Sequence, residues 1–186
     1  MRFFSFSSGL ALLAAALLAG CCANNTCDCQ DELEDAIQLR FKTSDTTSTR
    51  PTGFRLAELD TIRIVRYRLN STATDTVVRT RRKGEADKAL VISPETPFNP
   101  NSSARPGIYR FAVLLTSGSR RRPQVRQRFE LRDIQLRGRI EPDGCCTCYE
   151  NTSKTASLLV FPLGPNAPAS EPIPINLDQA IELTRP

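Results

Sequence analysis

Short segments in which apolar and polar residues alternate recur along this chain, and they constrain its fold more than any other feature. The clearest lie at residues 36–42, 108–116 and 125–140. A two-residue period is that of a strand with one buried face, whereas a helix needs a period near 3.6. The one segment with a weak helical pattern is residues 178–183. The sequence therefore predicts strands almost throughout.

Turns rich in proline, glycine, serine and asparagine separate these segments from further candidate strands at residues 62–69, 76–81, 89–93, 156–163 and 173–177. We expect an all-β fold, an antiparallel sandwich-like domain of the immunoglobulin or transthyretin-like kind with about seven to nine short strands. In the first of these further strands we expect Val65, Tyr67 and Leu69 to share one face. Ile62 and Ile64 fall out of phase with them, which indicates a bulge or burial on both faces. The phase of residues 125–140 slips at Asp133, which indicates a bulge or a break between two strands.

Histidine and tryptophan are absent from the 186 residues, and this excludes several kinds of site. Without an imidazole there is no Ser-His-Asp or Cys-His catalytic site and no His-ligated zinc. We therefore expect no catalytic residues, no bound metal and no cofactor. Paired carboxylates in turns, such as Glu58 with Asp60 or Glu141 with Asp143, leave a glycosidase-like enzyme as a separate hypothesis.

Residues 1–20 have the pattern of a secretory signal peptide. Arg2 precedes a wholly apolar run at residues 10–18, which is too short to cross a bilayer. The run ends in Leu18-Ala19-Gly20-Cys21. These four residues resemble the lipobox of bacterial lipoproteins, in which Leu, a small residue and then Gly or Ala precede a cysteine.

The resemblance implies that a diacylglycerol is attached to the Cys21 thiol and that the leader is cleaved just before it. The new amino group is usually acylated, for example with palmitate, and several acyl chains together hold a protein firmly at a membrane. The next residue is Cys22 rather than Asp. In many Gram-negative bacteria an Asp there retains a lipoprotein in the inner membrane. We therefore expect an exported protein anchored to the outer membrane. The sequence does not decide whether it lies on the periplasmic face or on the cell surface.

The residues after Cys21 are strongly acidic. Residues 21–35 carry no base and five acids, namely Asp28, Asp31, Glu32, Glu34 and Asp35. Such a run repels itself and stays solvated. We therefore expect residues 21–35 to form a lipidated acidic tether, with an acidic signal for surface display as the sharper alternative. Residues 36–186 then form the sandwich-like domain.

If Cys21 carries lipid, six cysteines remain in two clusters, which are Cys22, Cys27 and Cys29 near the anchor and Cys145, Cys146 and Cys148 after a turn. An even number of cysteines in an exported chain favours disulfides, although sequence alone does not choose the pairing. A pairing between the clusters would clamp the tether against the sandwich. Free or intermolecular thiols are an alternative. So is a soft metal site or a thiol-redox centre built from Cys27, Cys29, Cys145, Cys146 and Cys148.

Residues 125–140 also place five arginines on one expected solvent face, namely Arg126, Arg128, Arg132, Arg137 and Arg139. Guanidinium groups bind phosphate and carboxylate through paired hydrogen bonds. This face is therefore a candidate for an anionic envelope glycan or a lipid headgroup. Nucleic acid is not expected, because aromatic residues that would stack on bases are scarce there. The alternative is a solvated sheet face.

Three Asp-Thr pairs precede a small or apolar residue. They resemble an O-glycosylation motif of one group of Gram-negative bacteria and mark Thr46, Thr61 and Thr76 as candidate sites. The simpler interpretation is that Asp and Thr bond local amides in turns before strands.

These observations lead to one main hypothesis, a membrane-anchored lipoprotein whose β-domain is a non-catalytic binding or envelope-structural module. The alternative function is metal binding or thiol-redox chemistry at the two cysteine clusters.

Overall fold

The computed structural model describes residues 27, 29, 31–81, 84–98, 105–117, 123–144, 146–162 and 168–186. Its strands are β1 (Ile37–Phe41), β2 (Thr61–Arg68), β3 (Thr74–Thr80), β4 (Leu90–Ile92), β5 (Tyr109–Ser117), β6 (Gln124–Asp143), β7 (Cys146–Phe161), β8 (Ile173–Asn176) and β9 (Ile181–Leu183). Single helical turns are α2 (Asp31–Glu34), η1 (Leu56–Glu58) and η2 (Pro106–Ile108). The predicted signal peptide, Cys21, Cys22 and Cys145 lie outside the described residues.

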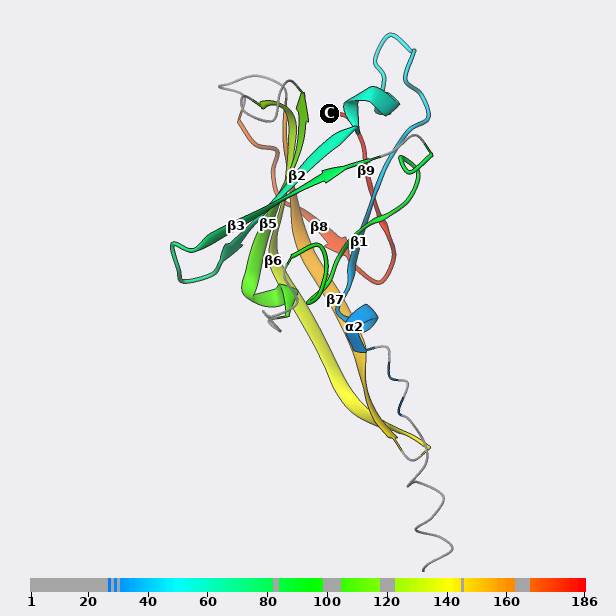
Figure 1. Ribbon diagram of the computed structural model, residues 1–186, viewed down its shortest axis with the longest axis vertical. Coiled ribbons are helices and arrows are strands. Elements are labelled where there is room, and N and C mark those ends of the chain that lie inside the picture. Colours follow the sequence, from blue (N-terminus) through cyan, green and yellow to red (C-terminus); the bar gives the residue numbers. More distant parts are fainter. Residues whose placement is uncertain are drawn as a thin grey trace, which may run out of the picture.

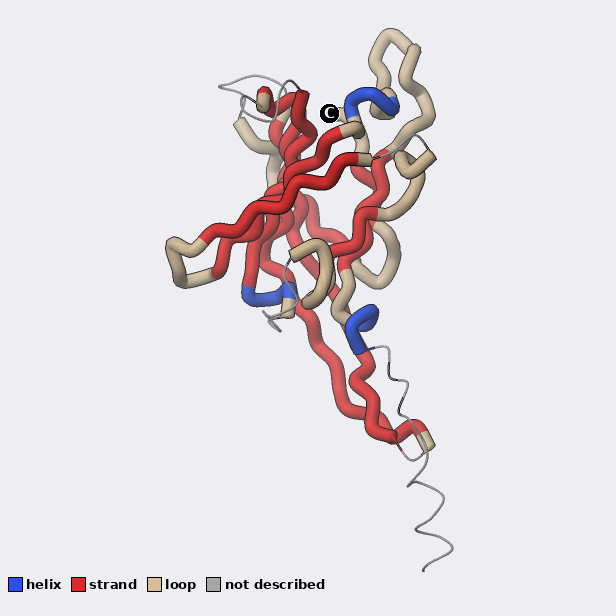
Figure 2. The backbone as a smooth tube through the Cα atoms, viewed as in Figure 1, coloured by secondary structure: helices blue, strands red, loops and turns tan. Residues whose placement is uncertain are grey.

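The strands form two sheets, which confirms the predicted all-β, sandwich-like architecture (Figure 1). The larger sheet has the order β3-β2-β5-β6-β7-β8, and the smaller has the order β4-β1-β9. All pairs are antiparallel except β1 with β9, which run parallel. Strands predominate over helix throughout (Figure 2). The described residues include no helix long and apolar enough to span a membrane.

The core lies between the sheets and is centred on three phenylalanines. Phe41 of β1, Phe54 of the following loop and Phe129 of β6 meet edge to face, with ring centroids 5.9 to 6.4 Å apart. The alternation of β1 is confirmed, because Ile37, Leu39 and Phe41 are all buried while the residues between them are exposed. Aromatic pairs in this geometry stabilise a core beyond the area that they bury.

Strand β2 has buried side chains on one face and half-buried ones on the other, which agrees with burial on both faces and not with a bulge. The structure buries Ile62 and Ile64 completely, whereas Val65 and Tyr67 are only half-buried on the opposite face. No bulge interrupts the pairing of β2 with β3 or β5. The alternation is broken at Arg66, which lies on the same inner face as Ile62 and Ile64. Its guanidinium lies 4.3 Å from the centre of the Phe98 ring and pairs with Asp75, so a cation covers the core edge.

The long segment after residue 124 is one strand with a bulge, as the phase slip at Asp133 predicted. Asp133 has a φ of 53°, and the register with β7 shifts between Arg132 and Gln135. Beyond this bulge β6 and β7 leave the sandwich together as a two-stranded arm, residues 134–155, which points away from the C-terminus (Figure 1).

The weak helical pattern near the C-terminus is not realised. Residues 181–183 form β9, which pairs with β1, and both Ile181 and Leu183 are buried. Their alternate spacing suits a strand that lies on one face of the core, and burial of these two side chains outweighs a helix of about one turn.

We predict that Phe129→Ala lowers the free energy of unfolding by about 3 to 5 kcal/mol, because it leaves a cavity between the sheets. Ile140→Ala on the same strand serves as the matched control, since Ile140 is 68% exposed. That variant should change stability by less than about 0.5 kcal/mol. Urea unfolding with the disulfides intact measures both. Equal losses in the two variants would contradict the assignment of the core.

Candidate functional site: docking of the N-terminal segment on the arm

Two disulfides join the N-terminal segment to the tip of the arm. They are Cys27–Cys146 and Cys29–Cys148, with Cα–Cα distances of 5.5 and 5.3 Å. Both pairs are 119 residues apart, so Cys27 and Cys29 follow the start of β7 in the parallel direction. The predicted linkage between the two cysteine clusters is therefore present for these four cysteines. In the chain-entropy model a closed loop of this size contributes about 5 kcal/mol.

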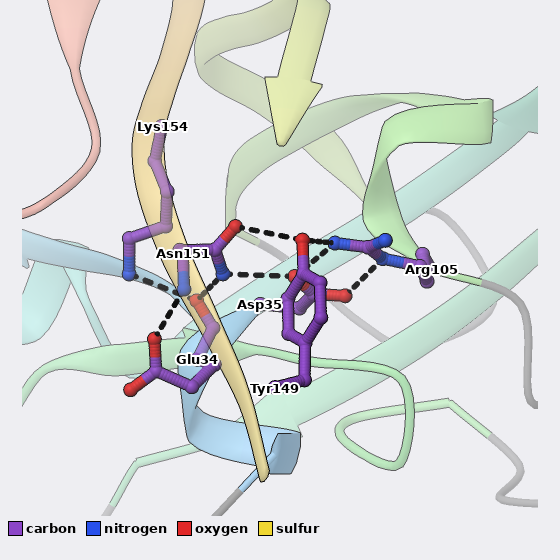
Figure 3. Close-up of polar contacts among 6 residues, drawn as sticks. All are labelled: Glu34, Asp35, Arg105, Tyr149, Asn151 and Lys154. Carbon is purple, nitrogen blue, oxygen red and sulfur yellow. Dashed lines mark hydrogen bonds and ion pairs between the residues drawn. The ribbon is translucent and has the colours of Figure 1, made fainter. Parts of the chain in front are cut away.

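Above the disulfides, polar side chains bind the same segment to β7 (Figure 3). The backbone N–H of Asn151 donates to Oε2 of Glu34 at 2.9 Å, and its side-chain amide donates to Oδ1 of Asp35 at 2.9 Å. Nζ of Lys154 donates to the carbonyl oxygen of Glu34 at 3.0 Å. Strand β7 thereby supplies donors to the carboxylates of Glu34 and Asp35 and to the carbonyl oxygen of Glu34.

Asp35 is the centre of this network and the most buried of its charged groups, with 4% of its surface exposed. Arg105 forms an ion pair with it through Nε and also donates from Nη2 to Oδ1 at 2.7 Å. This contact with Asp35 raises the pKa of Arg105 above the ordinary value of arginine, and the hydrogen bond to Tyr149 adds to the effect against the opposing effect of burial. A buried carboxylate requires such a partner, because leaving it unpaired in a low dielectric is costly.

Gly138 makes room for the side chain that completes the network. A Cβ at this position would collide with the phenol ring of Tyr149 and the carbonyl oxygen of Glu150. The hydroxyl of Tyr149 donates to Oδ1 of Asn151 at 3.2 Å and accepts from Arg105, whose guanidinium lies 4.4 Å from the ring centre. A larger residue at 138 would displace the ring from both partners.

The docked segment covers an edge of the sheet. Among the described residues, strand β7 pairs with β8 only over residues 155–158, and no other described strand lies along its edge below that point. The disulfides, Glu34 and Asp35 occupy this edge from residue 146 to residue 154. Uncovered sheet edges invite pairing with other chains. The segment therefore fastens the N-terminus and protects the arm at the same time.

The prediction that the whole acidic run stays solvated was wrong at its C-terminal end. Asp35 is buried and paired with Arg105, and Glu34 is bound to Asn151 and Lys154. Charge repulsion within the run is overcome because β7 and the loop before η2 supply cations and amide donors. The sequence shows only the acids, since their partners lie far away along the chain.

The disulfides bear on the alternative of a metal or redox site. Four of the five proposed ligands, Cys27, Cys29, Cys146 and Cys148, are bonded to one another and present no thiolate. The described residues hold no group of three or more side chains able to bind a metal ion. The carboxylates considered for catalysis are held by arginines in two cases, with Glu58 bound to Arg185 and Glu141 bound to Arg139.

Much of the charge of the predicted arginine face is already used within the chain. Arg128 and Arg132 both form ion pairs with Glu130, whose side chain is 2% exposed on the same face. Arg139 is paired with Glu141. Arg126 donates to Ser117 at 2.7 Å, and Arg137 lies 3.5 Å from the side-chain oxygen of Gln135. The face therefore has a structural role in burying Glu130, and its binding of an anion stays a prediction.

The three candidate glycosylation sites differ in accessibility. Thr46 and Thr61 are half-buried, whereas Thr76 is exposed on β3. The preceding aspartates have local roles, because Asp45 accepts from the backbone and hydroxyl of Thr52 and Asp75 pairs with Arg66. Hydrogen bonds from Ser48 and Thr52 lower the pKa of Asp45. Glycosylation itself stays a prediction.

A cleft lies at the end of the sandwich opposite the arm. Its volume is about 630 Å³, and apolar side chains line its walls between η1 and the ends of β5 and β6. The charged residues at the cleft are Glu58 and Arg185, which pair with each other, and Arg126. Buried Gln127 also lines it. A cleft of this size suits a small ligand.

No family model, no curated protein and no solved structure matches this chain. The class of protein is therefore argued from its own residues, and the site that they define is a covalently stapled junction between the N-terminus and the arm. Of this site the sequence predicted the cysteines. It did not indicate Arg105, Asn151, Tyr149 or Gly138. The one available signal was the shared spacing of Cys27-x-Cys29 and Cys146-x-Cys148, which suits side chains on one face of two neighbouring extended segments.

We predict that Arg105→Ala destabilises the protein more than Asp35→Ala does. Loss of Arg105 leaves the buried carboxylate of Asp35 without its cation and should lower the free energy of unfolding by about 3 kcal/mol. Loss of Asp35 leaves a half-exposed guanidinium that water can solvate and should lower it by about 1 to 2 kcal/mol. Denaturant unfolding with intact disulfides gives both values. Arg139→Ala is the control, because its exposed pair with Glu141 should be worth less than about 1 kcal/mol. The reverse order would show that Asp35 is not the buried centre.

Proposed function

We propose that this chain is a lipoprotein of a bacterial outer membrane, and that its β-domain is a non-catalytic binding or envelope-structural module held off the membrane by the arm. The observation that carries the proposal is the attachment of residues 27 and 29 to the arm tip. A chain that is disulfide-bonded to the arm a few residues after its lipid anchor holds the arm tip close to the membrane surface. A free linker of the same length would not fix the orientation of the domain in this way.

Chain length supports a short distance between the anchor and the arm tip. Cys27 lies six positions after the lipobox cysteine, Cys21, and a chain of that length spans at most about 20 Å. From the tip the arm rises along β7 from residue 146 to residue 154, which corresponds to about 27 Å of strand. The arm then acts as a rigid spacer between the bilayer surface and the sandwich.

The orientation that follows leaves the cleft at the far end of the molecule from the anchor. Its lining from Phe54, Leu115 and Val125, together with Arg126, offers apolar contact and a cation to a ligand. We assign the binding role of the module to this cleft and keep an anionic glycan or lipid headgroup as the ligand predicted for the arginine face. The pairing of four cysteines favours a structural role for them over metal or thiol-redox chemistry.

The anchor is tested by Cys21→Ser in the full-length chain. The native protein should fractionate with outer membranes and show a mass that begins at Cys21 and includes acyl chains, whereas Cys21→Ser should lose both properties because its thiol is the acylated group. Cys22→Ser is the matched control and should remain anchored. A native mass without acyl chains would remove the anchor and the localisation with it.

The spacer is tested by energy transfer from a fluorophore to an acceptor dye at the lipid headgroups. Single cysteines are introduced at Ile140, an exposed residue of the arm, or at Leu56, an exposed residue of η1. Transfer should be several times stronger from I140C than from L56C, because it falls steeply with distance. Removal of both disulfides should reduce that difference. Equal transfer from the two positions would contradict the proposed orientation.

A further inference from the structure

The described edges of both sheets are protected in different ways, with one exception. Strands β4 and β9, at the edges of the smaller sheet, have three residues each. Strand β8 contains Pro174, which has no N–H to offer a neighbouring strand. The stapled N-terminal segment covers the arm edge of β7. These are the devices by which sheet proteins avoid pairing with other chains.

The exception is β3. It forms the other edge of the larger sheet, and the turn of the β2–β3 hairpin projects from the left side of the molecule in Figure 1. Its seven residues, Thr74–Thr80, include no proline and pair with β2 without a bulge. Val78 is 45% exposed, and β2 is the one described strand that pairs with β3. Alternate backbone N–H and C=O groups of β3 therefore lack a strand partner among the described residues.

The sequence of β3 is complementary to itself when two copies run antiparallel. If a two-fold axis passes through Val77, all seven residues are paired and Asp75 lies opposite Arg79 of the second copy, twice. Arg79 is exposed and forms no ion pair with the described residues, and Asp75 is exposed beside its partner Arg66. Opposite charges that face each other across strands stabilise the pairing.

Other alignments are less favourable. Parallel pairing in register places Asp75 opposite Asp75 and Arg79 opposite Arg79, and like charges directly opposite destabilise a pair of strands. Antiparallel pairing centred on Asp75 or on Arg79 does the same at its centre. The same two charges thus favour one register with an identical strand and oppose pairing with strands that lack complementary charges.

We propose that two copies of this chain associate through antiparallel pairing of their β3 strands about a two-fold axis at Val77. The contact has the same patch on both subunits and closes on itself, as two-fold interfaces do. The larger sheets of the two copies then continue into one another. The pairing is independent of the lipid anchor, because it uses only residues of β3.

Disulfide trapping of the full-length chain tests the register. In Val77→Cys the two introduced thiols lie directly opposite, with Cα atoms about 4.5 to 5.5 Å apart, a distance that a disulfide spans. In Val78→Cys, the matched control, the two copies are displaced along the strands to about 8 Å, which is too far. Mild oxidation in native membranes should convert V77C, but not V78C, into a covalent dimer with a 77–77 linkage in its peptide mass spectrum.

Charge reversal tests the ion pairs. Arg79→Asp should reduce dimer formation in the V77C background at least about fivefold, since it places two carboxylates opposite each other. A differently tagged chain with Asp75→Arg should likewise dimerise poorly alone. A mixture of the two should restore pairing as a heterodimer. Thermal unfolding checks that D75R folds, and if it does not, R79D carries the test by itself.

Four results would overturn the proposal. Trapping of V78C as readily as V77C would exclude the register, and no trapping of either variant would exclude the pairing. A covalent adduct of V77C with a different protein would show that the edge docks another partner rather than a second copy. Unchanged trapping in R79D would show that Asp75 and Arg79 do not direct the pairing, and the argument for a second copy of the chain depends on these two charges.

Discussion

The covalent attachment of the N-terminal segment to the edge of β7 is the constraint on which the rest of the structure depends. A two-stranded arm on its own is marginally stable, because it buries little surface. Here two disulfides and the Asp35 network add a third segment along its exposed edge. The same contacts fix where Ala36 enters the sandwich, and therefore where β1 lies between the sheets. The arm and the domain thus form one unit, which supports the spacer role that we propose.

The many arginines of this chain act largely as structural groups. Arg105 holds Asp35, while Arg128 and Arg132 enclose Glu130. Others lie over aromatic rings, as Arg66 does over Phe98 and Arg110 over Tyr67. A planar guanidinium bonds a carboxylate and stacks on a ring at once, which an ammonium group does less well. A basic composition therefore gives little indication of a ligand, because the acids that neutralise these arginines belong to the same chain.

Comparison of particular elements shows where sequence reasoning succeeded. Strand β1 and the bulge at Asp133 were predictable, because a strand with one buried face repeats every two residues and a bulge shifts that repeat by one. The phase of strand β2 was ambiguous in the sequence, because Arg66 occupies an inward position that alternation assigns to solvent. The weak helical pattern of residues 178–183 was misleading, because so short a segment cannot establish a period, and residues 181–183 form β9. The cysteines of the candidate site were predictable, but its polar partners were not.

The sequence by itself determined the class of fold and the candidate anchor. Alternation, turn residues and the four residues Leu18-Ala19-Gly20-Cys21 are all local patterns. It also determined that exported cysteines in two clusters would favour disulfides. Only the tertiary structure decided which thiols meet, that Asp35 is buried against Arg105, and that β3 is left as the open edge. These features join residues about 70 to 120 positions apart or depend on which strands are neighbours. Such contacts are selected by the packing of the whole chain, and no local pattern records them.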